Sequence, residues 1–167
     1  MAREILRVGR LSLVKGAPEH AESVAERLRF NDRRECMIYG LEPLAALTEP
    51  FAAPVSRTYT IKHDHDSIAM CGVVEQDNKS ARVWMLGTGG VNTNFRQFLR
   101  GCREVIDILQ GEYETLENFV PVDHHETIMW LSWCGFVFDE ELYEINGHTM
   151  MRFVRCTVQQ NNVYYLN

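Results

Sequence analysis

The chain has 167 residues, of which 46% are hydrophobic, and a net charge of −6, a composition that can bury the core of one domain. The acidic balance, with no run of Lys and Arg among aromatic residues, argues against nucleic-acid binding. No apolar stretch approaches the roughly 20 residues that span a bilayer, and no signal peptide opens the chain, so we expect neither membrane insertion nor export.

The cysteines predict a reducing compartment. The chain has five cysteines: Cys36, Cys71, Cys102, Cys134 and Cys156. They are widely spaced, odd in number and contain no Cys-x-x-Cys pair, which argues against a disulfide framework, a zinc site or a redox motif. We expect buried free thiols.

The first third of the chain predicts one strand and one clear helix. Leu11–Lys15 alternates as a strand does, and Pro18 suits the first turn of a helix over 18–28. Three prolines interrupt residues 31–54, for which we expect a short helix and a loop.

The middle of the chain changes to strand periodicity. The predicted strands are 58–62, 68–74 and 82–86, the first two joined at His63–Asp66. A helix follows over 95–109, because its apolar residues recur at steps of three and four until Gly111.

The last third predicts strand 115–122, short helix 126–134 and strands 137–145 and 149–157, joined by a type I′ turn at Asn146-Gly147. The succession therefore predicts an α/β (α+β) fold with a mixed, mainly antiparallel sheet. We assign residues 1–157 to one domain and 158–167 to a C-terminal tail, which either docks on a partner or folds back.

One segment has the local order of an anion site. The strand before Gly87 ends in Gly87-Thr-Gly-Gly-Val-Asn-Thr-Asn94, and a helix follows. Glycine lets the backbone approach a phosphate, and the free amides and dipole at the start of a helix attract it. Alternatively, Asn92 or Thr93 caps the helix and the glycines make only a tight turn.

This order of elements, with Gly135-Phe136 after the short helix, resembles the GNAT-fold N-acetyltransferase superfamily from Leu11 to Thr157. The resemblance implies a GNAT-like central sheet flanked by about four helices, and acetyl-CoA as cofactor. No metal is expected, for reasons given below. The cofactor-binding residues that it implies are Met85, Leu86, Gly87, Thr88, Gly89, Gly90, Asn92 and His124.

A narrower resemblance is to the small internal virion proteins of short-tailed bacteriophages, a divergent branch of the same fold. The similar segments are Trp84–Thr88, Phe98–Arg100, Asn118–Val122 and Ile128–Phe138. This resemblance implies an accessory role in virion assembly or the internal virion core. The implied partners are other phage virion proteins or a host protein, and the implied location is the virion or the host cytoplasm.

Two departures from the superfamily affect catalysis. Leu131 stands where many members carry the Tyr general acid, and leucine cannot donate a proton. The loop also lacks the usual initial Arg or Gln and glycine spacing. We therefore expect a catalytically degenerate protein, the alternative being an active acetyl-CoA-dependent N-acetyltransferase acting on a host protein or small amine. Gly89→Arg and Gly90→Arg should then block the cofactor while preserving the fold.

The catalytic residues are not defined by the sequence. Glu75, Asp123 and Glu126 are candidate bases or plain surface carboxylates. His124 either replaces a polar group of the family or is a solvated residue at a helix start, and Tyr143 is a substitute acid. The clusters His63–Asp66 and Asp123–Glu126 lack the geometry of a metal site, since one is a hairpin tip and the other has no i, i+4 His pair.

Overall fold

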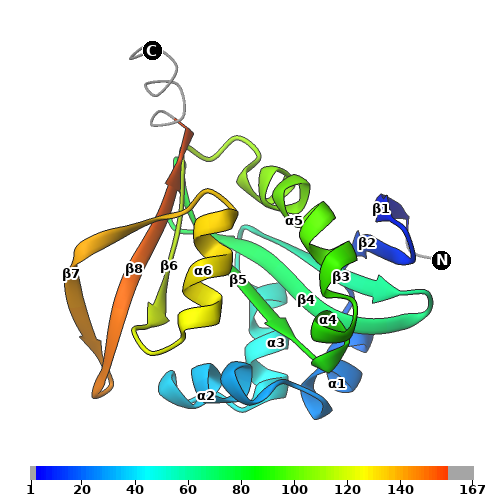
Figure 1. Ribbon diagram of the computed structural model, residues 1–167, viewed down its shortest axis with the longest axis horizontal. Coiled ribbons are helices and arrows are strands. Elements are labelled where there is room, and N and C mark those ends of the chain that lie inside the picture. The colour runs from blue at the N-terminus through cyan, green and yellow to red at the C-terminus, as the bar shows by residue number, and fades with distance from the viewer. Residues whose placement is uncertain (1–2, 158–167) are drawn as a thin grey trace.

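The structure is a computed structural model that describes residues 3–157, and its centre is one eight-stranded sheet of order β1-β2-β3-β4-β5-β6-β8-β7 (Figure 1). The strands are β1 (Glu4–Val8), β2 (Leu11–Lys15), β3 (Ser56–His63), β4 (Asp66–Glu75), β5 (Ser80–Gly87), β6 (Thr115–Pro121), β7 (Val137–Ile145) and β8 (His148–Cys156). All neighbours pair antiparallel except β5 and β6, which are parallel. The predicted mixed, mainly antiparallel sheet is confirmed.

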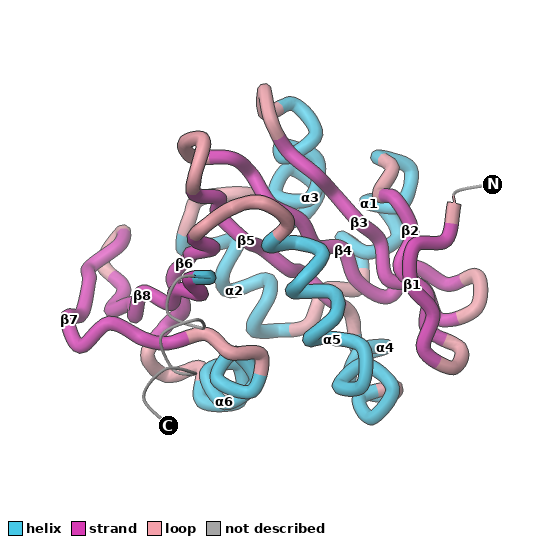
Figure 2. Tube along the Cα trace, turned by 90° about the horizontal axis from the view of Figure 1, so that it is seen from above, coloured by secondary structure: helices cyan, strands magenta, loops and turns pink. Residues whose placement is uncertain are grey.

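Helices cover both faces of the sheet (Figure 2). They are α1 (Pro18–Glu26), α2 (Phe30–Ile38), α3 (Pro43–Ala52), α4 (Gly89–Thr93), α5 (Phe95–Gln110) and α6 (His125–Trp133). On one face α1 and α3 pack on β3 and β4, and α5 and α6 lie on the other. None of the helices within residues 3–157 is long and apolar enough to cross a membrane.

Each face of the sheet has its own buried cluster, and α5 shows why its sequence folds as a helix. Its apolar stripe, from Phe98 through Ile106 to Leu109, is buried against the sheet. Gly111 ends the helix at φ 50°, a left-handed conformation that glycine adopts without strain. On the opposite face, Val24 of α1 and Leu47 of α3 are fully buried.

The region of residues 31–54 differs from its prediction, and residues 3–157 contain six helices rather than about four. Pro43 opens α3 instead of interrupting it, because the first helical positions need no N–H donor. Pro50 lies near the end of the same helix, which stops at Ala52. The whole of α2 precedes these prolines, and α4 is a single extra turn before α5.

Two hairpins follow the predicted turn chemistry, and one strand was missed. Asn146 and Gly147 both have positive φ, as a type I′ turn requires, which confirms that hairpin. The turn after β3 likewise places Asp64 at φ 54°. Strand β1 was not predicted, because it is an edge strand with mostly exposed side chains. The tail predicted over 158–167 lies outside the described residues.

Candidate functional site

A V-shaped opening lies in the middle of the sheet, where β5 and β6 part. The two strands pair at only three positions, from Ser80↔Thr115 to Arg82↔Glu117. Immediately beyond, the Asn118 side-chain amide donates to the Val83 carbonyl at 2.7 Å and takes the place of the next backbone contact. The strands then run separately to their carboxyl ends, so the sheet has a gap there.

The gap belongs to a cleft with a volume of about 1560 Å³. One wall is largely apolar and comes from α4, α5 and α6, through Val91, Phe95, Leu99, Trp130 and Trp133 among others. The other wall comes from α2 and is polar, with Arg29, Asp32 and Glu35. Such a cleft suits an elongated ligand that places an apolar part on one side and a polar group on the other.

The backbone of β5 presents unpaired groups to this opening. The Thr88 N–H donates to the Ile68 carbonyl of β4 at 2.8 Å. The backbone N–H and C=O groups of even-numbered β5 residues therefore point toward β4, and those of odd-numbered residues point toward the gap. Of the odd-numbered residues, Gly87 accepts from the Arg29 N–H at 3.0 Å. Within the described chain, the N–H and C=O of Met85 have no partner across the gap. Met85 can therefore pair with an amide-bearing ligand.

The polar groups of the glycine loop mostly form hydrogen bonds within the protein. The Thr88 hydroxyl accepts from the Gly90 N–H at 3.2 Å and donates to the Ile68 carbonyl at 2.8 Å. Thr88 therefore caps α4. The predicted cap of the helix over 95–109 by Asn92 or Thr93 is wrong, because α5 follows Asn94, whose side chain makes no capping hydrogen bond.

The two glycines of this loop have different surroundings. A Cβ on Gly90 would lie 2.6 Å from Ile68 Cγ2, so Gly90→Arg cannot preserve the fold as expected. A Cβ on Gly89 meets nothing within 4 Å. Gly89 is thus the position where the loop offers open space to a ligand.

The predicted cofactor residues fall into three places. Met85, Leu86, Gly89 and Asn92 line the cleft. Gly87, Thr88 and Gly90 form the turn at the end of β5 and do not line the cleft. His124 lies apart from both sets, immediately before α6, and contacts α2.

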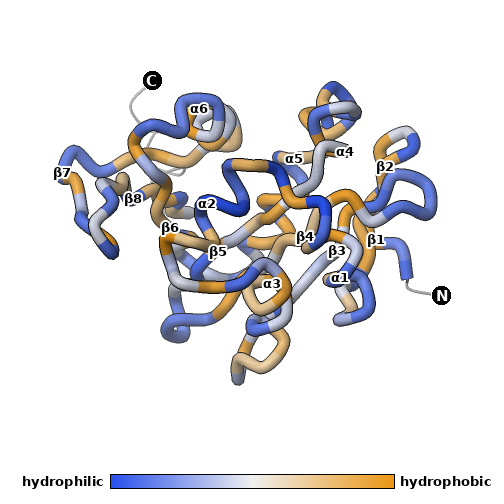
Figure 3. Tube along the Cα trace, turned by 90° about the horizontal axis from the view of Figure 1, so that it is seen from below, coloured by the Kyte–Doolittle hydropathy of each residue, from blue (hydrophilic) through white to orange (hydrophobic). Residues whose placement is uncertain are grey.

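Helix α2 crosses the wide end of the opening and connects its two arms (Figure 1). Next to its first residue, Arg29 bonds to Gly87 of β5, and in its middle the Arg34 guanidinium bonds to Asp123 at 2.9 Å, just after β6. Its last residue, Ile38, accepts from the Asn146 amide of the β7–β8 hairpin at 2.8 Å. Figure 3 shows α2 as a largely hydrophilic segment on this underside, consistent with these polar contacts.

Two carboxylates of α2 are the functional side chains that sequence reasoning missed. Asp32 is 6% exposed and accepts from the Arg29 Nε at 2.6 Å. Burial raises the pKa of Asp32, while the Arg29 guanidinium and the Gly87 amide act in the opposite direction. Burial also raises the pKa of Glu35, while the neighbouring His124 ring acts in the opposite direction. No periodicity marked these residues, because α2 has no continuous apolar stripe.

His124 is a core residue, so its reading as a solvated residue at a helix start is wrong. Only 3% of it is exposed, and it lies between Arg34 and Glu35. Its Nε2 is 3.4 Å from the Arg34 Nη1, and its Nδ1 is 3.6 Å from the Glu35 Oε1.

The other catalytic candidates do not converge. Glu75 accepts from the Tyr113 hydroxyl at 3.1 Å, and Tyr143 donates to Asp139 at 3.1 Å, and neither borders the cleft. Asp123 pairs with an arginine, whereas Glu126 does line the cleft. Leu131 is buried at 5% exposure and supplies no proton. Within residues 3–157, no three His, Cys, Asp or Glu side chains form a metal-binding group.

No family model and no curated protein sequence matches the chain. Its fold is that of the GNAT acetyltransferases. A GNAT-family acetyltransferase from Bacillus anthracis superposes with a TM-score of 0.67 at 8% identity, covering 92% of this chain and 98% of that chain. RimL, a ribosomal alpha-N-protein acetyltransferase in complex with coenzyme A, has a TM-score of 0.67 at 11% identity, covering 92% and 98%.

A third similar structure is a chimera of the spermidine N-acetyltransferase SpeG from Vibrio cholerae. Its TM-score is 0.67 at 15% identity, covering 92% of this chain and 99% of that chain. At such low identities these likenesses define the fold alone.

Proposed function

We propose that the chain binds acetyl-CoA in the cleft between β5 and β6 and transfers its acetyl group to an amine. The observation that carries this proposal is the unpaired backbone of Met85 in the gap of the sheet. The pantetheine arm of coenzyme A contains amides, which can pair with an open strand as an added strand would. RimL is a similar structure in complex with coenzyme A, and the similar structure of MccE is in complex with acetyl-CoA.

The residues of the cleft fit such a cofactor along its length. Met85 would hold the pantetheine amides, and the apolar wall that includes Phe95 and Trp130 would exclude water from them. Gly89 and Arg29 border the end of β5 and would face the phosphates. When bound, acetyl-CoA supplies an activated thioester.

Isothermal titration of acetyl-CoA tests this proposal. The variant is Gly89→Glu, since a Cβ there meets no atom within 4 Å and the carboxylate adds a negative charge beside the expected phosphates. Gly89→Ala is the matched neutral control. We expect binding by the wild type and the alanine variant, and a loss of about tenfold or more in Gly89→Glu, the effect of roughly 1.4 kcal/mol of repulsion. No heat of binding by the wild type, with an unchanged melting temperature, would contradict the proposal.

A second candidate function is an accessory role in the virion of a short-tailed bacteriophage, without efficient catalysis. Leu131 favours it, because this buried apolar residue stands where the superfamily places its proton donor. The partners would be other phage virion proteins or a host protein. This candidate predicts that the chain is found in purified phage particles and transfers no acetyl group. Turnover with acetyl-CoA and an amine would remove its claim of degeneracy.

A further inference from the structure

Two of the five free cysteines meet at the apolar wall of the cleft. Cys102 lies on α5 and Cys134 directly follows α6, and their Sγ atoms are 3.7 Å apart. Each of the two residues is 3% exposed. They are far apart in the sequence and form no Cys-x-x-Cys motif, so only the fold brings the two thiols into contact.

Other contacts already hold the two helices together at this point. Phe98 of α5 and Trp130 of α6 place their ring centroids 5.6 Å apart. The Arg103 Cζ lies 3.9 Å from the centroid of the Trp133 ring, and the Arg103 Nε donates to the Trp133 carbonyl at 3.1 Å. A disulfide needs a sulfur–sulfur distance of about 2.05 Å, so the two thiols need only a small further approach to form one.

The two thiols are chemically unequal, and Cys102 is the reactive one. The Cys134 thiol donates to the Cys102 Sγ, which lowers the pKa of Cys102 against the opposing effect of burial. The neighbouring indoles of Trp130 and Trp133 also lower this pKa. The Trp130 Nε1 is buried and makes no hydrogen bond within residues 3–157, so a thiolate at Cys102 gives it an acceptor. The contact with Cys102 raises the pKa of Cys134, which therefore stays protonated.

A small oxidant can reach Cys102 from two sides. Cys102 lines the cleft, and it also lines a second, apolar cavity of about 30 Å³ between α5 and the β1–β2 hairpin. One water molecule needs about 10–15 Å³, so this cavity has room for hydrogen peroxide beside the sulfur. Burial raises the pKa of Cys36 to about 11 and that of Cys71 to about 12, which keeps these two thiols protonated and unreactive.

We propose that hydrogen peroxide oxidises Cys102 and Cys134 to a reversible disulfide, which narrows the cleft against its ligand. The Cys102 thiolate first attacks the peroxide: an S–O bond forms, the O–O bond breaks, and the leaving oxygen takes the proton that Cys102 released and departs as water. The Cys134 sulfur then attacks the sulfenic acid at Cys102. An S–S bond forms, the S–O bond breaks, and the oxygen leaves as a second water with the Cys134 proton. The two thiols lose two electrons, which the peroxide gains.

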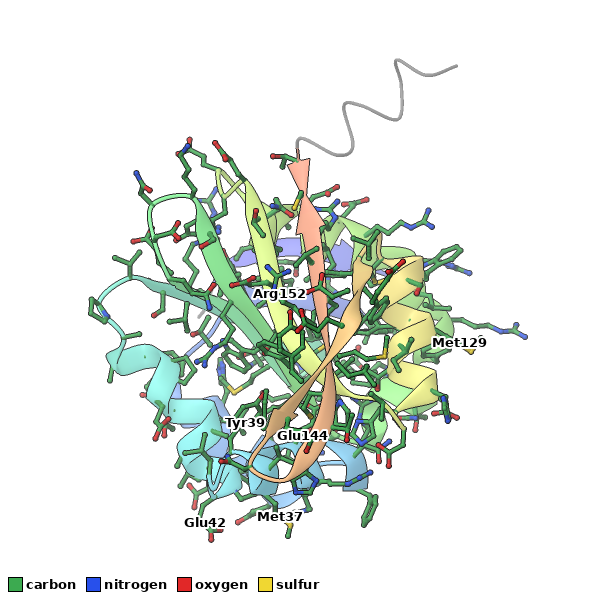
Figure 4. All side chains as sticks on the ribbon, turned by 90° about the vertical axis from the view of Figure 1, so that its left-hand side faces the viewer. Met37, Tyr39, Glu42, Met129, Glu144 and Arg152 are labelled. Carbon is green, nitrogen blue, oxygen red and sulfur yellow. The ribbon has the colours of Figure 1, made fainter. Side chains whose placement is uncertain are left out.

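The effect on the cleft follows from the place of the pair in the fold. Helix α5 follows β5 and α6 follows β6, so the disulfide ties together helices from the two arms of the opening. On its outer side α6 exposes Met129 (Figure 4), and it packs Trp130 against α5. Drawing α6 toward α5 reduces the space beside Trp130, which lines the cleft. This effect on a ligand rests on the proposed binding of acetyl-CoA, whereas the oxidation does not.

Peroxide treatment of the full chain tests the disulfide without any ligand. We expect the wild type to lose about 2 Da, the mass of two hydrogen atoms, to yield a linked peptide pair containing Cys102 and Cys134, and to be restored by dithiothreitol. Cys134→Ser should stop at a sulfenic acid on Cys102 that dimedone traps. Cys156→Ser is the control, because it removes a partly exposed thiol outside the pair and should oxidise as the wild type does. The peptide map of the wild type needs no variant to fold, and a map in which Cys102 and Cys134 remain thiols overturns the proposal.

Titration of acetyl-CoA into the reduced and the oxidised protein tests the effect on the cleft. We expect oxidation to weaken binding by about tenfold or more, dithiothreitol to restore it, and Cys156→Ser to respond as the wild type does. Equal affinities of the two forms overturn the narrowing of the cleft and leave both the disulfide and the proposed function. Binding by neither form overturns the proposed function and the narrowing with it, while the disulfide stands on its peptide map.

Discussion

Glu35 shows how a single half-buried carboxyl group links the site to stability. Its pKa is raised from an ordinary value of 4.5 by burial, so the neutral form is favoured more in the folded than in the unfolded protein. The stability that comes from protonation is fully present below the unfolded value and is lost as pH rises through the folded value.

We therefore predict that Glu35→Gln gains stability relative to the wild type as pH rises above 4.5. The gain should be about 1.4 kcal/mol for each unit by which the pKa is raised. Melting temperatures of both proteins from pH 4 to pH 8 measure it, with Glu22→Gln on the exposed face of α1 as the control. A difference in melting temperature that does not change with pH would contradict the raised pKa.

Two adjacent glycines in the loop after β5 should differ in how much stability the same substitution costs. Gly90→Ala forces a Cβ to within 2.6 Å of the Ile68 side chain, so we predict destabilisation of about 1–3 kcal/mol. Gly89→Ala meets no atom within 4 Å, so its stability should change by less than about 1 kcal/mol, in either direction. Urea denaturation of the pair gives both values, and similar losses at the two positions would refute the packing role of Gly90.

At the scale of elements, α2 is held in place by hydrogen bonds and ion pairs rather than by a continuous apolar face. Arg34 bonds to Asp123 and approaches the buried Nε2 of His124. Arg34→Ala leaves this ring nitrogen unsatisfied, so we predict a loss of about 1–2 kcal/mol and faster proteolysis within α2. The exposed Arg96→Ala on α5 is the control. If both variants unfold at the same urea concentration, the contacts of Arg34 with Asp123 and His124 contribute nothing to stability.

The elements that the sequence predicted well are those whose signals are local. The apolar stripe of α5 and the Asn146-Gly147 turn need no distant partner to be recognised. In α2 the pattern is unclear, since Phe30 is 80% and Met37 76% exposed while Asp32 is buried. That helix is held by residues from β5 and from the turn before α6, which no local pattern can indicate.

The candidate site divides in the same way. Met85, Gly89 and Asn92 belong to the predicted strand–turn–helix segment, and the structure does place them along the cleft. Asp32 and Glu35 were missed because the region before Pro43 was expected to be irregular. His124 was singled out through the family resemblance, but only the fold brings it against Glu35.

At the scale of the whole molecule, the sheet consists of two parts that share few contacts. Strands β1 to β5 form one part and β6 to β8 the other, and three paired positions join them before the gap. A ligand that bonds within the gap adds contacts between the parts, so its binding should be visible both in global stability and at one backbone amide. Ligand at 100 times its Kd raises the free energy of unfolding by about 2.7 kcal/mol.

Hydrogen exchange can identify that amide. Without ligand, the N–H of Met85 should exchange faster than those of Trp84 and Leu86, because these even-numbered neighbours face β4 and Met85 faces the gap. Acetyl-CoA should slow Met85 by about tenfold or more, the effect of one added hydrogen bond of roughly 1.4 kcal/mol, and leave Leu86 unchanged. A rise in melting temperature with no protection of Met85 would mean that acetyl-CoA binds elsewhere, since only a ligand paired with β5 can cover this amide.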